Sequence, residues 1–163
     1  MENKLGSGFG IVGGIVAMDQ AIKYWTETQM AYQQRIDILP FFDLFRVHNQ
    51  GIAFSMFWGA GPWLLVTVAA AICAFVLWLW RSNPPERWLS HIGFGLIVGG
   101  ALGNIIDRAM LGYVVDMFLF YLENWQFAVF NFADAAISVG AGAVILDELI
   151  AWRKTKPDDN PAV

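Results

Sequence analysis

Three long apolar stretches constrain this chain more than any other feature of its sequence. Residues 62–80 and 88–106 contain no Asp, Glu, Lys or Arg, and residues 127–146 contain a single charge, Asp134. A helix of about 20 residues crosses the roughly 30 Å hydrocarbon core of a bilayer, so each stretch predicts a transmembrane helix. The apolar share of the chain is 57% and the charged share 15%, and a soluble domain of this size could not bury so much apolar surface.

A fourth and weaker span is expected over residues 8–25. Its apolar core covers only residues 8–18, and Asp19, Gln20 and Lys23 follow it. A basic residue before an apolar run is also typical of a signal peptide, but no small-x-small cleavage site follows, so we expect a retained span. The sequence therefore predicts an all-α membrane protein with four transmembrane helices and a small β-rich surface loop region outside the membrane.

The basic residues predict how this single membrane domain, residues 1–154, is oriented. The spans at about 8–25, 62–80, 88–106 and 127–146 would be joined on one side by loops of about 26–61 and 107–126. Six basic residues fall on the side of the termini (Lys4, Arg81, Arg87, Arg153, Lys154, Lys156), against four on the other (Lys23, Arg35, Arg46, Arg108). Because positive loops stay inside, we expect both termini and the polar tail 155–163 to be cytoplasmic, and both long loops to be extracytoplasmic.

Polar residues at membrane depth cluster near the outer ends of the predicted spans. The cluster comprises Asp19, Lys23, Asn104, Asp107, Arg108, Asn131 and Asp134, with Asp116 in the second outer loop. Spacings of three and four residues place the members from each helix on one face. Ionisable groups inside a membrane are costly and are functional candidates by default. Two carboxylates, Asp116 and Asp134, would suit general acid and base chemistry at one site.

Other chemistries have weaker support. The only two histidines, His48 and His91, are far apart and Cys73 is the only cysteine, so we expect no metal site. The net charge is −4 and the chain has no basic block, so we expect no nucleic-acid partner. The overlapping Gly-x-x-x-Gly patterns at 95–99 and 99–103 predict close helix packing. In the first outer loop, polar and aromatic residues over 41–57 surround a turn signal at 49–51, which predicts short strands or a hairpin on the membrane surface.

Two non-enzymatic classes remain open at this point. A small transporter or channel subunit would also use acids within the membrane. An ion path, however, needs polar groups across the whole thickness of the bilayer, and the inner halves of these spans are apolar. An assembly protein would explain the helices and the glycine patterns, but not two carboxylates and two asparagines at one depth. Replacing Asp116 by Asn should leave an assembly protein working and stop a protease.

Five short motifs follow one another between residues 19 and 137. They are Asp19-Gln20-x-x-Lys23, Asn49-x-Gly51-x-Ala53-Phe54, Gly103-Asn104-x-x-Asp107-Arg108, Gly112-x-Val114-Val115-Asp116 and Asn131-x-Ala133-Asp134-x-x-Ile137. In this order and on a four-span chain, they resemble the lipoprotein signal peptidases, the type II signal peptidases of bacterial membranes.

This resemblance implies an aspartic endopeptidase of the bacterial cytoplasmic (inner) membrane, with its site facing the periplasmic or outer side. Such enzymes remove the signal peptide from diacylglyceryl-modified prolipoproteins by cutting before the lipidated cysteine, and they need no cofactor. Asp116 and Asp134 match the catalytic pair. The resemblance also implies that eight further residues of this chain bind substrate or shape the site: Asp19, Lys23, Asn49, Gly51, Asn104, Asp107, Arg108 and Asn131. The implied partners are the prolipoprotein and membrane lipid, and we expect a monomer in which the loop at 41–57 covers the substrate.

Overall fold

The structure, a computed structural model, describes the backbone of residues 2–51 and 61–155. The elements in chain order are α1 (Glu2–Gln29), β1 (Arg35–Leu39), β2 (Phe42–Asn49), α2 (Pro62–Ser82), α3 (Trp88–Leu111), β3 (Val114–Leu122), β4 (Trp125–Gln126) and α4 (Phe132–Thr155). The Ala53-Phe54 part of the second motif and residues 156–163 of the predicted tail lie outside the described residues. Of the loop expected to cover the substrate, residues 52–57 also lie outside them.

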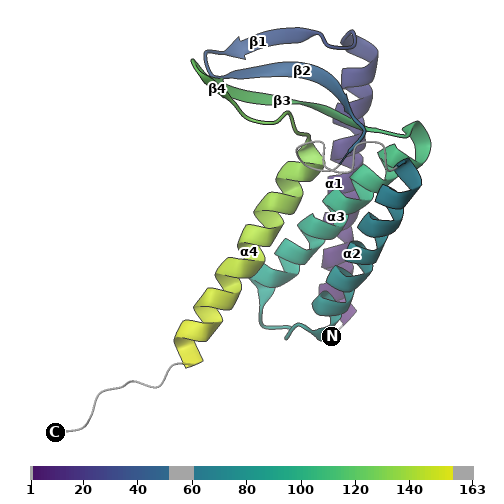
Figure 1. The fold of residues 1–163 in the computed structure, drawn as a ribbon. Coiled ribbons are helices and arrows are strands. Elements are labelled where there is room, and N and C mark those ends of the chain that lie inside the picture. The colour runs from purple at the N-terminus through teal and green to yellow at the C-terminus, as the bar shows by residue number, and fades with distance from the viewer. Residues whose placement is uncertain (1, 52–60, 156–163) are drawn as a thin grey trace, which may run out of the picture.

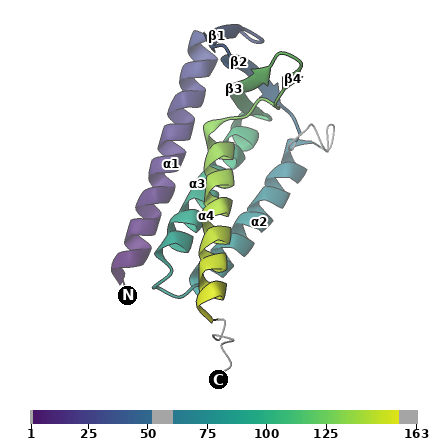
Figure 2. The same cartoon turned by 90° about the vertical axis from the view of Figure 1, so that its left-hand side faces the viewer.

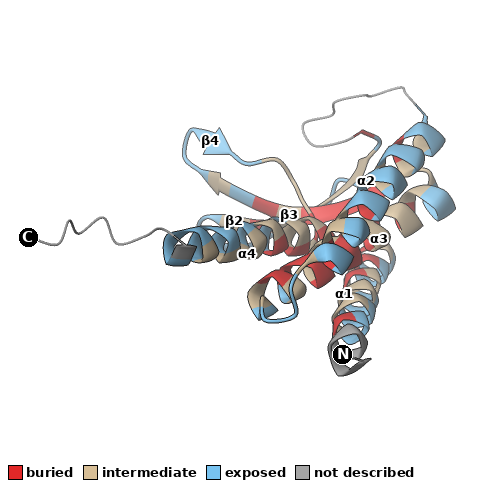
Figure 3. Cartoon of the chain, turned by 90° about the horizontal axis from the view of Figure 1, so that it is seen from below, coloured by how far each residue is buried: buried red, intermediate tan, exposed pale blue. Residues whose placement is uncertain are grey.

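Helix α3 is the centre of the helical layer, and α1, α2 and α4 pack against it (Figures 1 and 2). The sheet lies across one end of this layer. The start of α1, the end of α4 and the connection between α2 and α3 all lie at the opposite end (Figure 1). Buried residues gather on α3 and on β3, whereas the outer surfaces of α2 and α4 are exposed (Figure 3).

Glycines let α3 approach its neighbours closely. A Cβ added at Gly99 would lie 2.8 Å from Ile15 Cβ of α1, and one at Gly95 would lie 3.1 Å from Ile11 Cγ2. The predicted packing role of the Gly-x-x-x-Gly patterns is thus confirmed, and the partner is α1. On another side of α3, a Cβ at Gly93 would lie 2.7 Å from the Gly140 carbonyl of α4. These contacts leave no room for a side chain between the backbones.

Three of the four predicted spans have helices long and apolar enough to cross a membrane. Within the described residues these are Pro62–Ser82, Trp88–Leu111 and Phe132–Lys154, and the described part of α1 is not among them. Helix α2 exposes many large apolar side chains, as a helix surrounded by lipid does: Trp63, Leu64, Ile72, Phe75 and Trp78.

The predicted β-rich region is a single antiparallel sheet of order β1-β2-β3-β4. Strands β1 and β2 come from the first outer loop and β3 and β4 from the second, so the β2–β3 pairing joins the two loops. The hairpin turn between β1 and β2 lies at Pro40 and Phe41, whereas the turn signal at 49–51 ends β2. Asp116, expected in a loop, lies within β3, paired with Val47 next to a register shift in β2.

Helix α4 begins later than the predicted span at 127–146 and extends further, to Thr155. Apolar residues before it are used in the sheet instead: the Phe127 N–H donates to the Phe120 carbonyl at 2.8 Å, and Phe130 forms a bridge with Phe118. An apolar run alone does not distinguish a strand from the first turn of a helix, which explains the difference. The start of α4 is therefore fixed at the underside of β3.

Candidate active site

The ends of α1, α3 and α4 meet beneath β2 and β3, and the predicted site residues come together there. The polar cluster consists of Asp19 and Lys23 on α1, Asn49 and Gly51 at the end of β2, Asn104, Asp107 and Arg108 on α3, Asp116 on β3, and Asn131 and Asp134 at the start of α4. Hydrogen bonds and ion pairs link all ten of them into one network.

Asn131 contacts both members of the predicted carboxylate pair. Its side-chain Nδ2 donates to Asp116 Oδ1 at 2.6 Å, and its backbone N–H donates to Asp134 Oδ2 at 3.3 Å. Its Oδ1 in turn accepts the Asp134 N–H at 2.9 Å. The reciprocal bonds between Asn131 and Asp134 form a capping box, which explains why α4 starts here. The same residue thus starts a helix and connects the two carboxylates.

Asp116 is nearly inaccessible, with 1% of its surface exposed. Its second oxygen, Oδ2, accepts a hydrogen bond from Asn49 Nδ2 at 3.0 Å. Burial, followed by the nearby charge of Asp134, raises the pKa of the Asp116 carboxyl to about 7. Asn49 and Asn131 act in the opposite direction because they donate to the ionised form. Asp134 itself is half-buried, and its Oδ1 accepts from Asn104 Nδ2 at 2.8 Å.

Lys23 is the cation at the base of the cluster, and only 3% of it is exposed. Its Nζ lies 2.8 Å from Asp19 Oδ2, 2.9 Å from Asp107 Oδ2 and 2.9 Å from Asn104 Oδ1. All three donors of the ammonium group are therefore used. Because Asn104 Nδ2 also donates to Asp134, Lys23 orients this amide toward the carboxylate pair.

The two carboxylates around Lys23 also hold the backbone of the neighbouring elements. Asp19 Oδ1 accepts the N–H of Ala133, in the first turn of α4, at 2.9 Å. Asp107 Oδ2 accepts the N–H of Val115, beside Asp116 in β3, at 3.1 Å. These bonds connect α1 to α4 and α3 to β3, so both candidate catalytic residues sit on backbone fixed by a buried ion-pair network.

Arg108 connects the cluster to the end of β2. Its Nη2 donates to the carbonyl of Gly51 at 2.8 Å, and the Gly51 N–H donates to Asn49 Oδ1 at 3.0 Å, closing a short turn. The turn directs the Asn49 amide toward Asp116. The guanidinium also interacts electrostatically with Asp134, Asp116 and Asp107. Four carboxylates in the cluster thus face two cations, which favours retention of a proton on the pair.

Two further residues contribute that the sequence did not single out as site residues. Gln20 Nε2 donates to Asp107 Oδ1 at 2.9 Å and to the Gly103 carbonyl at 3.3 Å, which fixes Asp107 from the side opposite Val115. The sequence does contain a signal for Gln20, because this residue is part of the first motif. Glu27 binds Arg46 and His48 of β2, and its position four residues after Lys23 places it on the same face of α1.

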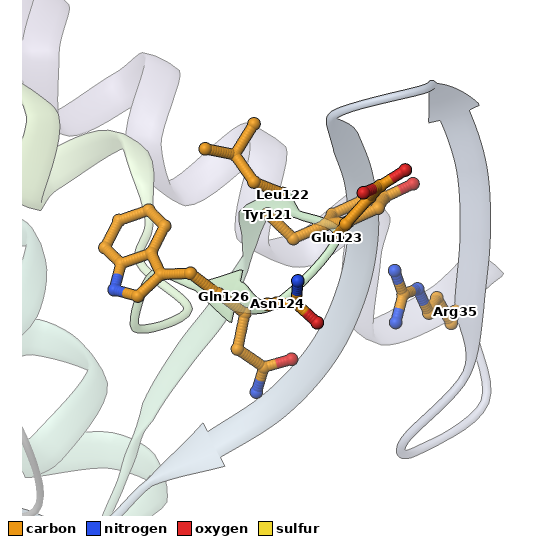
Figure 4. A pocket seen from close by; sticks show the side chains of 7 residues that line it. Arg35, Tyr121, Leu122, Glu123, Asn124 and Gln126 are labelled. Carbon is orange, nitrogen blue, oxygen red and sulfur yellow. The ribbon is translucent and has the colours of Figure 1, made fainter.

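A separate hollow of about 380 Å³ lies at the far end of the sheet (Figure 4). It is lined by Arg35 of β1 and by residues 121–126 of the β3–β4 hairpin. Arg35 also pairs with the buried Asp43, and it lies over the Tyr121 ring at 4.6 Å. In the described residues, no group of three or more His, Cys, Asp and Glu side chains is arranged to hold a metal ion.

The sequence matches a known protein family over most of its length. A family model described as signal peptidase (SPase) II matches residues 11–150. Proteins named lipoprotein signal peptidase from Brucella ovis and Brucella canis are each 54% identical over 145 residues, covering 86% of this chain and 88% of the relative.

Two solved structures, both described as bacterial membrane enzymes, share the fold. One has a TM-score of 0.85 at 24% identity and covers 97% of this chain and 94% of its own. The other has a TM-score of 0.77 at 25% identity, covering 93% and 95%. With the family model spanning most of the sequence and relatives at this level of identity, the chain belongs to the signal peptidase II family.

Proposed function

We propose that this protein removes signal peptides from diacylglyceryl-modified bacterial prolipoproteins, cutting before the lipidated cysteine. Membership of the signal peptidase II family and the name of its Brucella relatives support the reaction class. The observation that carries the catalytic assignment is the connection of Asp116 to Asp134 through Asn131. Two carboxylates held by one residue, one of them buried, can differ in protonation, as general acid and base chemistry requires.

In the proposed mechanism the pair carries one proton near neutral pH, and Asp116 holds it. Burial and the charge of Asp134 favour the protonated form of Asp116, and the half-buried Asp134 accepts a hydrogen bond from Asn104. Asp134 removes a proton from water while the water oxygen attacks the scissile carbonyl. Asp116 donates its proton to the carbonyl oxygen. Collapse of the tetrahedral intermediate then breaks the C–N bond: the amine leaves with the proton from Asp134, and one hydroxyl proton of the intermediate returns to Asp116 as the carboxylic acid product forms.

We propose that α1 is the fourth span, with both termini cytoplasmic and the polar cluster on the outer side of the inner membrane. Helix α1 packs along α3, which is itself long and apolar enough to span, and Gly95 and Gly99 contact successive turns of α1. The polar residues that weaken α1 as a span, Asp19 and Lys23, are paired within the cluster. Buried partners lower the cost of such charges in a membrane.

The lipid anchor of the substrate suits this location. Acyl chains on the cysteine would stay in the outer leaflet, while the scissile bond enters laterally at the level of the half-buried Asp134. Asn49, next to the carboxylate pair at the end of β2, is suited to hold the substrate backbone. Because its amide already faces Asp116, it would align the scissile carbonyl with the acid.

A cleavage assay tests this proposal. Purified protein in detergent or lipid is incubated with a diacylglyceryl-modified prolipoprotein, and signal-peptide loss is followed on a gel. Wild type should cleave, whereas Asp116→Asn and Asp134→Asn should be folded and inactive. Asp37→Asn makes the same isosteric, charge-removing change at an acid that is 88% exposed on β1. It should cleave as wild type does and serves as the matched control. Cleavage by either pair variant at the wild-type rate would refute the two-carboxylate mechanism.

A further inference from the structure

A second polar cluster lies where the C-terminal end of α1 meets the sheet. We call it the α1-end clamp and define it as Glu27, Arg46, His48 and Tyr113. Glu27 Oε2 lies 2.5 Å from Arg46 Nη2, and Glu27 Oε1 lies 2.8 Å from His48 Nε2. The His48 ring stacks on Tyr113 with centroids 3.9 Å apart and an interplanar angle of 16°. One carboxylate therefore holds two side chains of β2.

Arg46 extends this attachment to the backbone of α1. Its Nη1 donates to the Met30 carbonyl at 2.5 Å and to the Glu27 carbonyl at 3.1 Å, at the end of the helix where carbonyls have no helical partner. Its own backbone N–H donates to the Gln34 carbonyl at 3.1 Å. A cation at a helix C-terminus also complements the helix dipole. Only 12% of Arg46 is exposed, so this attachment is largely shielded from solvent.

The α1-end clamp acts on the opposite face of β2 from the carboxylate pair. Side chains alternate across a strand, so Arg46 and His48 face α1 while Asn49 faces the other way. Asn49 is the next residue after His48, and its Nδ2 donates to Asp116 Oδ2 at 3.0 Å. Tyr113 shares the His48 face and precedes β3, the strand that carries Asp116. The α1-end clamp therefore contacts β2 and the residue before β3 next to the Asn49–Asp116 hydrogen bond.

We infer that Glu27 is a positioning residue for the reaction: through Arg46 and His48 it holds β2 so that Asn49 donates to Asp116. Glu27 contacts neither carboxylate of the pair and acts only through the strand. Arg108 holds the chain just after Asn49 by its bond to Gly51, and the α1-end clamp holds the chain just before it. Asn49 is therefore fixed from both sides, by one cation on α3 and by one carboxylate on α1.

The first test measures the strand rather than the reaction. Amide hydrogen exchange is followed in β2 for wild type, Glu27→Ala, Glu27→Gln and the control Glu148→Ala. Glu148 is an acid at the opposite end of the molecule, 70% exposed and paired with Arg87. We expect faster exchange over β2 in Glu27→Ala. Glu27→Gln should lie in between because its amide oxygen can still accept from Arg46 or His48, and Glu148→Ala should match wild type. Unchanged exchange over β2 in Glu27→Ala would overturn the inference.

The second test rests on the proposed peptidase function and uses a double-mutant cycle. Glu27→Ala should lower kcat/KM about tenfold, in line with the loss of a hydrogen bond to a charged group, with partial rescue in Glu27→Gln. In an Asn49→Ala background, the same change should cause little further loss, because Glu27 acts through Asn49. If the losses in kcat/KM from Glu27→Ala and Asn49→Ala multiply in the double variant, the inference is overturned. Failure of wild type to cleave any lipidated prolipoprotein would refute the proposed function instead, and the exchange measurement would still decide whether Glu27 holds β2.

Discussion

Asn131 Nδ2 lies 2.6 Å from Asp116 Oδ1, and this short bond joins the residue just before α4 to the buried first part of strand β3. The same asparagine receives the Asp134 N–H on its own Oδ1. The start of the helix and the geometry of the carboxylate pair are therefore set by one side chain. A substitution at Asn131 can separate these two roles, because other residues cap helices but do not reach Asp116.

We predict that Asn131→Ser and Asn131→Ala both lose activity, and that Asn131→Ser keeps more of the stability because it still caps α4. Serine caps a helix about as well as asparagine, while alanine costs roughly 0.5–2 kcal/mol of stability. Neither side chain can donate to Asp116 from this position as the amide does. Thermal unfolding in detergent, combined with the cleavage assay, checks the pair. Full activity of Asn131→Ser would show that the bond to Asp116 is dispensable.

Lys23→Met should destabilise the protein strongly. The substitution leaves Asp19 and Asp107 buried without their cation, and removing one partner of a buried ion pair costs about 3–5 kcal/mol. The exposed pair between Arg35 and Asp37, at 3.9 Å, provides the contrast: Asp37→Asn should change stability by less than about 1 kcal/mol. Denaturant unfolding of both variants in the same detergent measures the difference. Equal effects would mean that the Lys23 network contributes no more than a surface pair.

The pH dependence of cleavage should report on Asp116. The carboxyl has a pKa raised to about 7, and in the proposed mechanism it must be protonated to donate. Activity should therefore decline as pH rises through about 7 and the acid loses its proton. Asn49 donates to the ionised form and so lowers this pKa. Removing the Asn49 amide should therefore raise the pKa of Asp116.

Asn49→Ala should consequently move the alkaline limb of the kcat/KM profile to higher pH, even though its maximal value is lower. The charged groups that interact with Asp116 and are unchanged in this variant are Asp134, Lys23 and Arg108. Profiles of wild type and Asn49→Ala are recorded in the same buffers. A limb that moves to lower pH would assign the titration to another group.

The sequence predicts the helices better than it predicts what lies between them. The predicted spans 62–80 and 88–106 lie within α2 and α3. Gly61 precedes the first apolar run and Arg81 follows it, and Arg87 precedes the second, so both runs are clearly marked in the sequence. At the start of α4 the apolar residues Phe127 and Phe130 suit a strand equally well, and only their pairing with β3 decides. Local pattern carries no information about such long-range pairing.

The site was predictable as a set of residues but not as a network. Helical spacing places Asp19 with Lys23, and Asn131 with Asp134, on shared faces. It does not indicate that Lys23 and Asn104, 81 residues apart, share a hydrogen bond. Nor does it distinguish Asp116 in a loop from Asp116 buried in a strand, which changes its pKa. These contacts depend on the packing of α1 and α4 on α3.

That packing supplies the last prediction, from two glycines of the same helix. A Cβ at Gly140 would lie 2.6 Å from the Gly93 carbonyl and 2.9 Å from Ile97 Cγ1, whereas one at Gly142 would meet nothing within 4 Å. Gly140→Ala should therefore push α4 away from α3 and cost about 1–3 kcal/mol through overpacking. Gly142→Ala should be neutral or stabilise by up to about 1 kcal/mol, since alanine is the better helix former.

The two alanine variants should also differ in activity. Asn104 on α3 donates to Asp134 on α4 at 2.8 Å, so a displaced α4 lengthens this bond and misplaces one member of the carboxylate pair. Gly140→Ala should cleave more slowly than wild type even below its unfolding temperature, and Gly142→Ala should cleave at the wild-type rate. Because the two variants add the same methyl group to the same helix, a difference between them reports the contact with α3 rather than helix propensity. Equal stability and equal rates in both would show that α4 can move on α3 without disturbing Asp134.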